Sequence, residues 1–160
     1  MADGQKKERG ARVRLPPPLL LVALIAAGVA LRYVVAPPPL PFARTVQLVV
    51  GAALAVAALL LGGSAFGLFR KAGQDARPWT PKTVLVAEGP YRFTRNPMYV
   101  GMMTLQVGIG LMLGNLWVVL LAAVYLVVVH YTAVLPEEAY LDGKFGDSYR
   151  QYKQKVRRYL

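Results

Sequence analysis

Long uncharged stretches alternate with short basic segments along this chain of 160 residues. The uncharged stretches are Leu15–Leu31, Thr45–Phe69 and Asn96–Pro136, and the last spans 41 consecutive positions without Asp, Glu, Lys or Arg. A helix that crosses a bilayer needs about 20 such residues. The first two stretches therefore each predict one membrane helix, and the third is long enough for two.

Proline, glycine and asparagine mark the ends of these predicted helices. Pro16, Pro17 and Pro18 suit a first helical turn, and the proline-rich segment 36–42 forces a turn before the second helix. Gly114 and Asn115 are the turn signal that divides the longest run into a tight hairpin. We therefore expect four membrane helices, at about residues 18–35, 45–69, 97–113 and 116–135.

The first predicted helix has two interpretations. A basic segment before an apolar run also describes a cleavable signal peptide. The run is long for that role, and it continues past Arg32 into further apolar residues. We therefore interpret it as a retained anchor and treat residues 1–160 as one membrane domain.

Basic residues concentrate in three segments of the chain. Five lie before the first predicted helix, six in the loop 70–96 and six in the C-terminal segment 136–160. With four spans all three segments fall on one side of the membrane, and loops rich in Lys and Arg face the cytoplasm. We expect a multi-pass integral membrane protein with both termini cytoplasmic.

The composition narrows the classes of partner. The formal net charge of +11, beside apolar spans, favours a bilayer with anionic lipids as partner over nucleic acid. The absence of Cys excludes disulfides and thiolate metal sites. The lone His130 has no second ligand nearby, so we expect no metal site. We expect His130 to be hydrogen-bonded between helices, and a role as general base stays open. The sequence leaves the oligomeric state open.

The C-terminal segment carries an amphipathic pattern. Its apolar stripe recurs at helical spacing through Leu141, Phe145, Tyr149, Tyr152, Val156 and Tyr159. Because Gly143 and Gly146 weaken the helix, we expect two helices with a break near Phe145–Gly146 and Asp147 as N-cap of the second. The segment is either a surface anchor on anionic lipid or a lid over a site at the membrane surface.

Opposite charges stand at the two feet of the predicted hairpin. Arg92 and Arg95 precede it, and Glu137 and Glu138 follow it. The arginines alone fit the cytoplasmic charge bias, and the glutamates alone fit a helix start at Pro136. Their joint placement suits a ligand with a carboxylate and an ammonium, such as an amino-acid-like cofactor. Tyrosines nearby offer stacking or cation–π contact, namely Tyr91, Tyr99, Tyr149 and Tyr152.

Three motifs in this order resemble a known family. The segment GPYRFTRNPMYVG, an apolar hairpin and EEAYLDGKFGDSYRQYKQKV resemble the C-terminal half of the isoprenylcysteine carboxyl methyltransferases. They are also similar to the related phospholipid N-methyltransferases. The shared pattern is RHPxY, a hydrophobic stretch, EE and a segment like LxxxFGxxYxxY, and the match covers about residues 83–157.

The resemblance implies an all-α integral membrane enzyme that binds S-adenosylmethionine without a Rossmann fold. It implies Arg95 and Glu138 as catalytic residues. The cofactor-binding residues that it implies are Gly89, Tyr91, Arg95, Asn96, Pro97, Tyr99, Glu137, Glu138, Tyr149 and Tyr152. The chain departs from the pattern where Asn96 replaces His. It also has Lys155 and Arg157 where the eukaryotic isoprenylcysteine enzymes have Arg and Pro.

Several functions remain compatible with this sequence. The leading expectation is methyl transfer to a lipid or lipidated acceptor, most simply carboxyl O-methylation of an isoprenylcysteine-like substrate. N-methylation of a phospholipid of the phosphatidylethanolamine type is the first alternative. A non-catalytic binding or scaffold protein of the same fold is the second. A small transporter is less favoured, because the sequence shows no internal repeat and no acidic residue within the spans.

Overall fold

The computed structural model describes residues 10–13 and 15–159, and their regular structure is helical. The helices are α1 (Pro17–Val34), α2 (Arg44–Lys71), α3 (Pro97–Met112), α4 (Leu116–Val129), α5 (Leu135–Phe145) and α6 (Asp147–Lys155). A 3-10 turn, η1, covers Gly89–Arg92, and a π-helical turn, η2, covers His130–Val134. The described residues contain no β-strand beyond an isolated bridge between Thr94 and Arg157, so the all-α prediction is confirmed.

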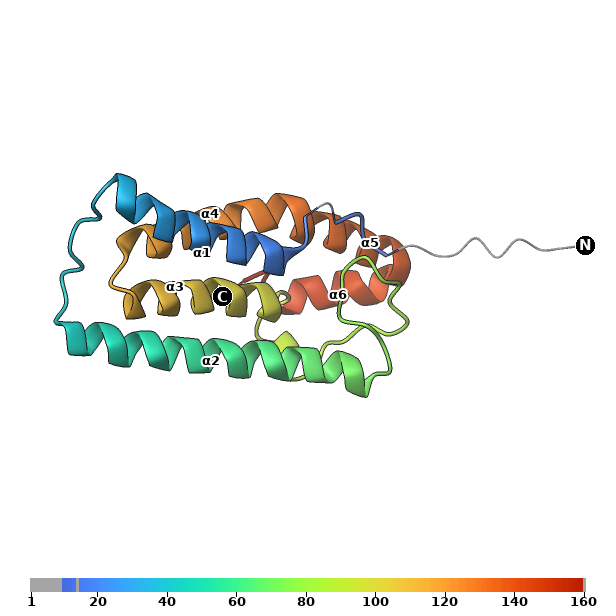
Figure 1. Cartoon of the computed structure of the whole chain (residues 1–160). Coiled ribbons are helices and arrows are strands. Elements are labelled where there is room, and N and C mark those ends of the chain that lie inside the picture. The colour runs from blue at the N-terminus through green and yellow to red at the C-terminus, as the bar shows by residue number, and fades with distance from the viewer. Residues whose placement is uncertain (1–9, 14, 160) are drawn as a thin grey trace, which may run out of the picture.

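The helices α1 to α4 lie side by side in a bundle (Figure 1). α3 packs against both α2 and α4, and α1 packs mainly against α4. The α1–α2 loop and the α3–α4 turn lie at one end of the bundle, while α5, α6 and the loop after α2 gather at the other (Figure 1). The predicted helix bounds differ from those observed by one or two residues at most ends. This agreement reflects the sharp breaks in hydropathy.

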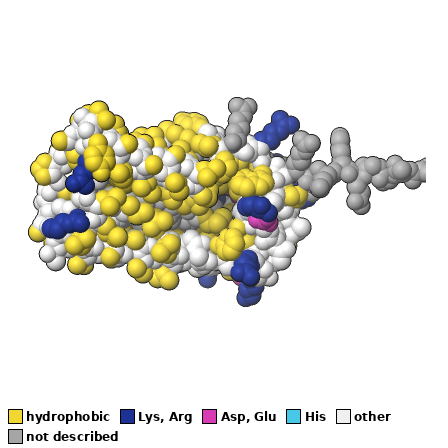
Figure 2. Space-filling model, in the orientation of Figure 1, with side chains coloured by type: hydrophobic (Ala, Val, Ile, Leu, Met, Phe, Trp, Pro, Cys, Tyr) yellow, Lys and Arg dark blue, Asp and Glu magenta, His cyan; other side chains and the backbone are white. Residues whose placement is uncertain are grey.

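Three helices are long and apolar enough to cross a bilayer. These are α1, α2 and the continuous helix from Leu116 to Phe145, with mean hydropathies of 1.9, 2.2 and 2.4. α3 is also apolar but has only 16 residues. Hydrophobic side chains such as Val22, Leu60 and Val127 are largely exposed on the bundle, and yellow atoms cover its flank in Figure 2. An apolar exterior of this extent defines an all-helical membrane protein.

The structure corrects the predicted helix start at Pro136. The backbone at Val134 and Leu135 is helical, so α4 continues through η2 into α5 without a free N-terminus. Glu137 and Glu138 therefore do not act as caps. Pro136 lacks an N–H and therefore cannot make the regular hydrogen bond of a continuous α-helix. The π turn immediately before it loosens the hydrogen-bond ladder, and π turns of this kind often occur at functional sites.

The break in the C-terminal segment lies where it was predicted, at Gly146. Its φ of 53° is a conformation that favours glycine, and α5 ends there. The predicted capping role of Asp147 was wrong. Gly146 is the N-cap, and Asp147 is the first residue of α6, which has no side-chain cap.

Glycine contacts set the spacing between α2 and α3. A Cβ on Gly51 would lie 2.7 Å from the carbonyl oxygen of Gly108, and a Cβ on Gly108 would lie 2.7 Å from that of Gly51. Gly108 therefore gives α3 a thin face that α2 can approach closely. Gly62 also lies beside α3, since a Cβ on Gly101 would come within 3.7 Å of the Gly62 α-carbon. A Cβ on Gly62, Gly63 or Gly67 would nevertheless meet no described atom within 4 Å.

This contrast gives a matched pair of stability variants in one helix. Gly51→Ala forces a methyl group onto rigid backbone and should destabilise the bundle by about 1–3 kcal/mol. Gly62→Ala adds the same methyl group in open space and should be neutral or slightly stabilising. Thermal melting of both purified variants in the same detergent measures the difference. Equal melting temperatures would contradict the close α2–α3 packing.

Candidate functional site

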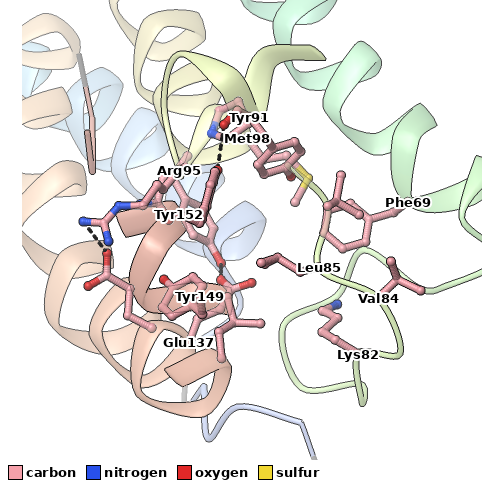
Figure 3. Close-up of a pocket in the computed structure, with 16 residues that line it drawn as sticks. Phe69, Lys82, Val84, Leu85, Tyr91, Arg95, Met98, Glu137, Tyr149 and Tyr152 are labelled. Carbon is pink, nitrogen blue, oxygen red and sulfur yellow. Dashed lines mark hydrogen bonds and ion pairs between the residues drawn. The ribbon is translucent and has the colours of Figure 1, made fainter. Parts of the chain in front are cut away.

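A pocket lies at the end of the bundle where α2 ends, α3 begins and α5 and α6 fold over (Figure 3). It encloses about 580 Å³ of empty space, including its open mouth. Nine of the ten predicted site residues line it, namely Tyr91, Arg95, Asn96, Pro97, Tyr99, Glu137, Glu138, Tyr149 and Tyr152. Gly89 does not line it. That residue starts η1 with a φ of 55° and so directs the turn that carries Tyr91.

The two halves of the pocket come from segments about 40 residues apart in the chain. Pro97 lies in the first turn of α3, which places Arg95 immediately before the helix and Tyr99 within its first turn. The continuous helix carries Glu137 and Glu138 past the same end of the bundle. The hairpin thus brings Arg95, Glu137 and Glu138 to one place, whereas Arg92 is exposed and does not line the pocket.

Glu138 pairs with two arginines. Its Oε1 lies 3.2 Å from Arg95 Nη2 and accepts a hydrogen bond from Arg158 Nε at 3.0 Å. Its Oε2 accepts a second bond from Arg158 Nη2 at 2.8 Å, which completes a two-pronged contact. The pKa of the Arg158 guanidinium lies above its ordinary value because it hydrogen-bonds to Glu138. Both carboxylate oxygens of Glu138 are therefore engaged within the protein.

Glu137 is engaged differently. Its Oε2 accepts a hydrogen bond from the Tyr99 hydroxyl at 2.9 Å. Within the described part of the chain no hydrogen bond reaches its other oxygen, and its carboxylate points into the pocket in Figure 3. Glu137 is therefore the acidic side chain best placed to accept from a ligand.

Lys82 is a lining residue that the sequence did not single out. It is 2% exposed, and its Nζ donates to the carbonyl oxygens of Asp75 at 2.6 Å and Arg77 at 2.8 Å. Burial lowers the pKa of the Lys82 ammonium, and the Nζ lies 4.9 Å from the centre of the Phe69 ring. The lysine thus holds the loop after α2 over the pocket. No motif or spacing marked it among the other basic residues of that loop.

Residues 156–159 form a segment, here called the C-terminal strap, beside the start of α3. The amide N–H of Arg95 donates to the Arg157 carbonyl at 2.9 Å, and Asn96 Nδ2 donates to the Arg158 carbonyl at 2.9 Å. His130 Nδ1 lies 2.8 Å from the Tyr159 hydroxyl. The expected hydrogen bond of His130 is thus observed, but its partner is the strap and not another membrane helix. Sequence reasoning missed the strap and its Arg158, because nothing in the pattern separates that arginine from the other terminal basic residues.

Three tyrosines form the aromatic wall of the pocket. Tyr91 and Tyr149 are buried, and the Tyr152 hydroxyl donates to the Tyr91 carbonyl at 2.7 Å. The Tyr149 and Tyr152 rings lie 6.1 Å apart between centroids. Burial raises the pKa of Tyr152 to about 12, so this phenol stays neutral near pH 7. The wall offers aromatic faces without an added negative charge.

An apolar groove lies next to this pocket. It is lined by Pro17, Pro18, Phe66, Ala76, Arg77, Pro78, Trp79, Met98, Tyr99 and Met102. Met98 and Tyr99 also line the charged pocket, so these two side chains separate the two spaces. A polar site thus adjoins an apolar groove in a membrane protein.

The fold and this site define an all-helical membrane protein with a charged pocket at one end of its bundle. A family model described as phospholipid methyltransferase matches residues 46–148. The chain belongs to that family, which confirms the resemblance drawn from the motifs.

Two curated proteins are similar to parts of this chain. The chain is 41% identical over 73 residues to the protein-S-isoprenylcysteine O-methyltransferase of Schizosaccharomyces pombe, a match that covers 46% of this chain and 31% of that enzyme. It is also 41% identical over 63 residues to an uncharacterized protein of Haemophilus influenzae, covering 39% of this chain and 100% of that protein. The chain thus spans about a third of the yeast enzyme.

Proposed function

We propose that this protein is an S-adenosylmethionine-dependent methyltransferase that acts at the membrane on a lipid or lipidated acceptor. The observation that carries the proposal is the presence of both Arg95 and Glu137 in the lining of one pocket of a phospholipid methyltransferase family member. S-adenosylmethionine carries both a carboxylate and an ammonium, and these two side chains match them in charge.

The residues present fit this cofactor. Arg95 has a buried Nε without a hydrogen-bond partner in the described chain, and its side chain is 10% exposed. An unpartnered buried donor is costly unless a ligand satisfies it. Arg95 would hold the cofactor's carboxylate, Glu137 its ammonium, and Tyr91, Tyr149 and Tyr152 would contact its apolar parts.

The cofactor supplies an activated methyl group on a sulfonium. The side chains of this protein then have to bind the cofactor, orient it toward the acceptor and exclude water. The loop held by Lys82 covers the pocket, and Tyr99 with its bond to Glu137 stands between the pocket and the apolar groove. We place the hydrocarbon chain of the acceptor in that groove, so that its head group meets the pocket beside Tyr99.

The two acceptor classes make different demands on the protein. A carboxylate acceptor is already nucleophilic and needs no base. An amine acceptor must lose a proton. Glu138 is engaged by two arginines, His130 does not line the pocket, and the Lys82 ammonium donates to two backbone carbonyls. Glu137 is therefore the candidate that we assign to that role. Because Glu137 already serves the cofactor, we favour carboxyl O-methylation, the reaction named for the yeast relative.

The same proposal includes the membrane topology. We propose that α3 crosses the bilayer as a fourth, shorter span and that residues 1–160 form one domain. The basic segments at the pocket end of the bundle then face the cytoplasm and contact anionic lipids. The cofactor reaches the pocket from the cytosol, and the acceptor enters from the bilayer.

A label-transfer assay tests the function and the acceptor class together. The purified protein is incubated with methyl-labelled S-adenosylmethionine and a native membrane extract, and the product is then treated with alkali. We expect volatile label, which indicates a methyl ester. Base-stable label in lipid would indicate phospholipid N-methylation instead. Cofactor binding without any transfer would support the scaffold alternative, and the absence of both would contradict the proposal.

A further inference from the structure

Arg158 makes the shortest contact in the charged cluster, although the sequence did not place it in the site. Its guanidinium binds both oxygens of Glu138, at 3.0 and 2.8 Å, while Arg95 reaches one of these oxygens at 3.2 Å. Two guanidinium charges share one carboxylate, so one net positive charge remains in the cluster. Of the two arginines, Arg95 is the one that lines the pocket, and its Nε is a buried donor without a partner in the described residues.

We propose that Arg158 is a positioning residue that neutralises Glu138 and thereby leaves Arg95 free to bind an anionic group in the pocket. Without Arg158, Arg95 alone would compensate the negative charge of Glu138. The two would form a closed one-to-one pair, with the guanidinium drawn to the carboxylate. A compensated guanidinium binds a second anion less well, because the attraction to that anion is offset by repulsion from Glu138.

The strap fixes Arg158 for this role. Its carbonyl accepts from Asn96 Nδ2 at 2.9 Å and from the Thr94 hydroxyl at 3.2 Å, so the residue is tied to the segment that carries Arg95. The next residue along the strap, Tyr159, is anchored through its hydroxyl, which lies 2.8 Å from His130 Nδ1. This arrangement also gives Asn96 a function. Its side-chain amide holds the strap and needs no titratable proton, which explains why an amide can stand where the family pattern has His.

The inference rests on the proposed function, and two ligands test it. S-adenosylhomocysteine contains the amino acid carboxylate, whereas methylthioadenosine keeps the adenosine and thioether but lacks the amino acid portion. Calorimetric titration of the purified protein in detergent measures both affinities. For Arg158→Gln we expect S-adenosylhomocysteine to bind at least about tenfold more weakly, the size of one lost charge-assisted bond. Methylthioadenosine should bind within about twofold of the wild type, because it carries no anion for Arg95.

Two further variants separate charge from fold. Arg158→Lys keeps the positive charge and should recover most of the S-adenosylhomocysteine affinity, although it cannot form the two-pronged contact. Arg157→Gln is the matched control, since the Arg157 side chain is exposed and only its backbone carbonyl contacts Arg95. It should bind both ligands as the wild type does.

Each remaining outcome has a defined meaning. An equal loss of both ligands in Arg158→Gln would overturn the inference, because it would show that the strap merely holds the fold. Unchanged binding of both would overturn it too. A wild-type protein that fails to bind S-adenosylhomocysteine would contradict the proposed function, and the inference would fall with it. Normal wild-type binding with no effect of Arg158→Gln would contradict the inference alone.

Discussion

Arg95→Ala is expected to lower the rate of methyl transfer by about 100-fold or more, the scale of losing a buried charged donor from a reaction site. Arg95 lines the pocket, has an Nε without a partner among the described residues and would hold the cofactor's carboxylate in the proposed arrangement. The variant keeps the Glu138–Arg158 contact, so the strap has a remaining ion pair to hold it. Initial rates with methyl-labelled S-adenosylmethionine measure the effect.

The control for this variant is Arg92→Ala. Arg92 ends the η1 turn only three residues earlier, but its side chain is exposed and outside the charged pocket. It should keep a rate within about twofold of the wild type, as surface substitutions generally do. A wild-type rate in Arg95→Ala would remove Arg95 from the proposed site. Equal losses in both variants would point to loop folding as the cause.

Glu137→Gln is expected to raise the KM for S-adenosylmethionine by about tenfold or more, because an ammonium would lose its charged acceptor. The side chain stays the same size and can still accept from the Tyr99 hydroxyl, so the fold should be retained. Initial rates over a range of S-adenosylmethionine concentrations, at saturating acceptor, give KM and kcat separately. They thus distinguish cofactor binding from the chemical step.

Glu88→Gln is the corresponding control for that substitution. Glu88 precedes η1, is exposed and does not line the charged pocket, so neutralising it removes one negative charge from outside the pocket. We expect no change in KM. If Glu137→Gln changes kcat but not KM, Glu137 acts on the acceptor and the amine alternative gains support. If it changes neither, the ammonium is held elsewhere.

The sequence predicted the helices well where local signals were strong. Gly114 and Asn115 were identified as the α3–α4 turn, and Asn115 is the N-cap of α4, accepting from the Trp117 amide. Gly146 was placed correctly as a helix break. The sequence failed at Pro136, where a proline and two acids read as a helix start. The helix continues through a π turn at His130–Val134, and no residue pattern predicts that turn.

The sequence predicted part of the candidate site, because some of its residues lie in local motifs. Motifs and charge placement identified Arg95, Glu137 and Glu138 and brought them together through the hairpin. They did not separate the two glutamates, and only the structure shows that Glu138 is engaged by arginines while Glu137 faces the pocket. The sequence did not single out Lys82 and Arg158, because each is one basic residue among several in its segment.

The sequence by itself determined the membrane class, the helix pattern and the gathering of opposite charges near one end. Hydropathy and turn preference act over short stretches of chain, so they can be read in order. The tertiary structure decided which charges pair, because that depends on distances between Arg95, Glu138 and Arg158 across three separate segments. The strap brings Arg158 to Glu138, and that contact leaves Arg95 as the uncompensated charge in the pocket.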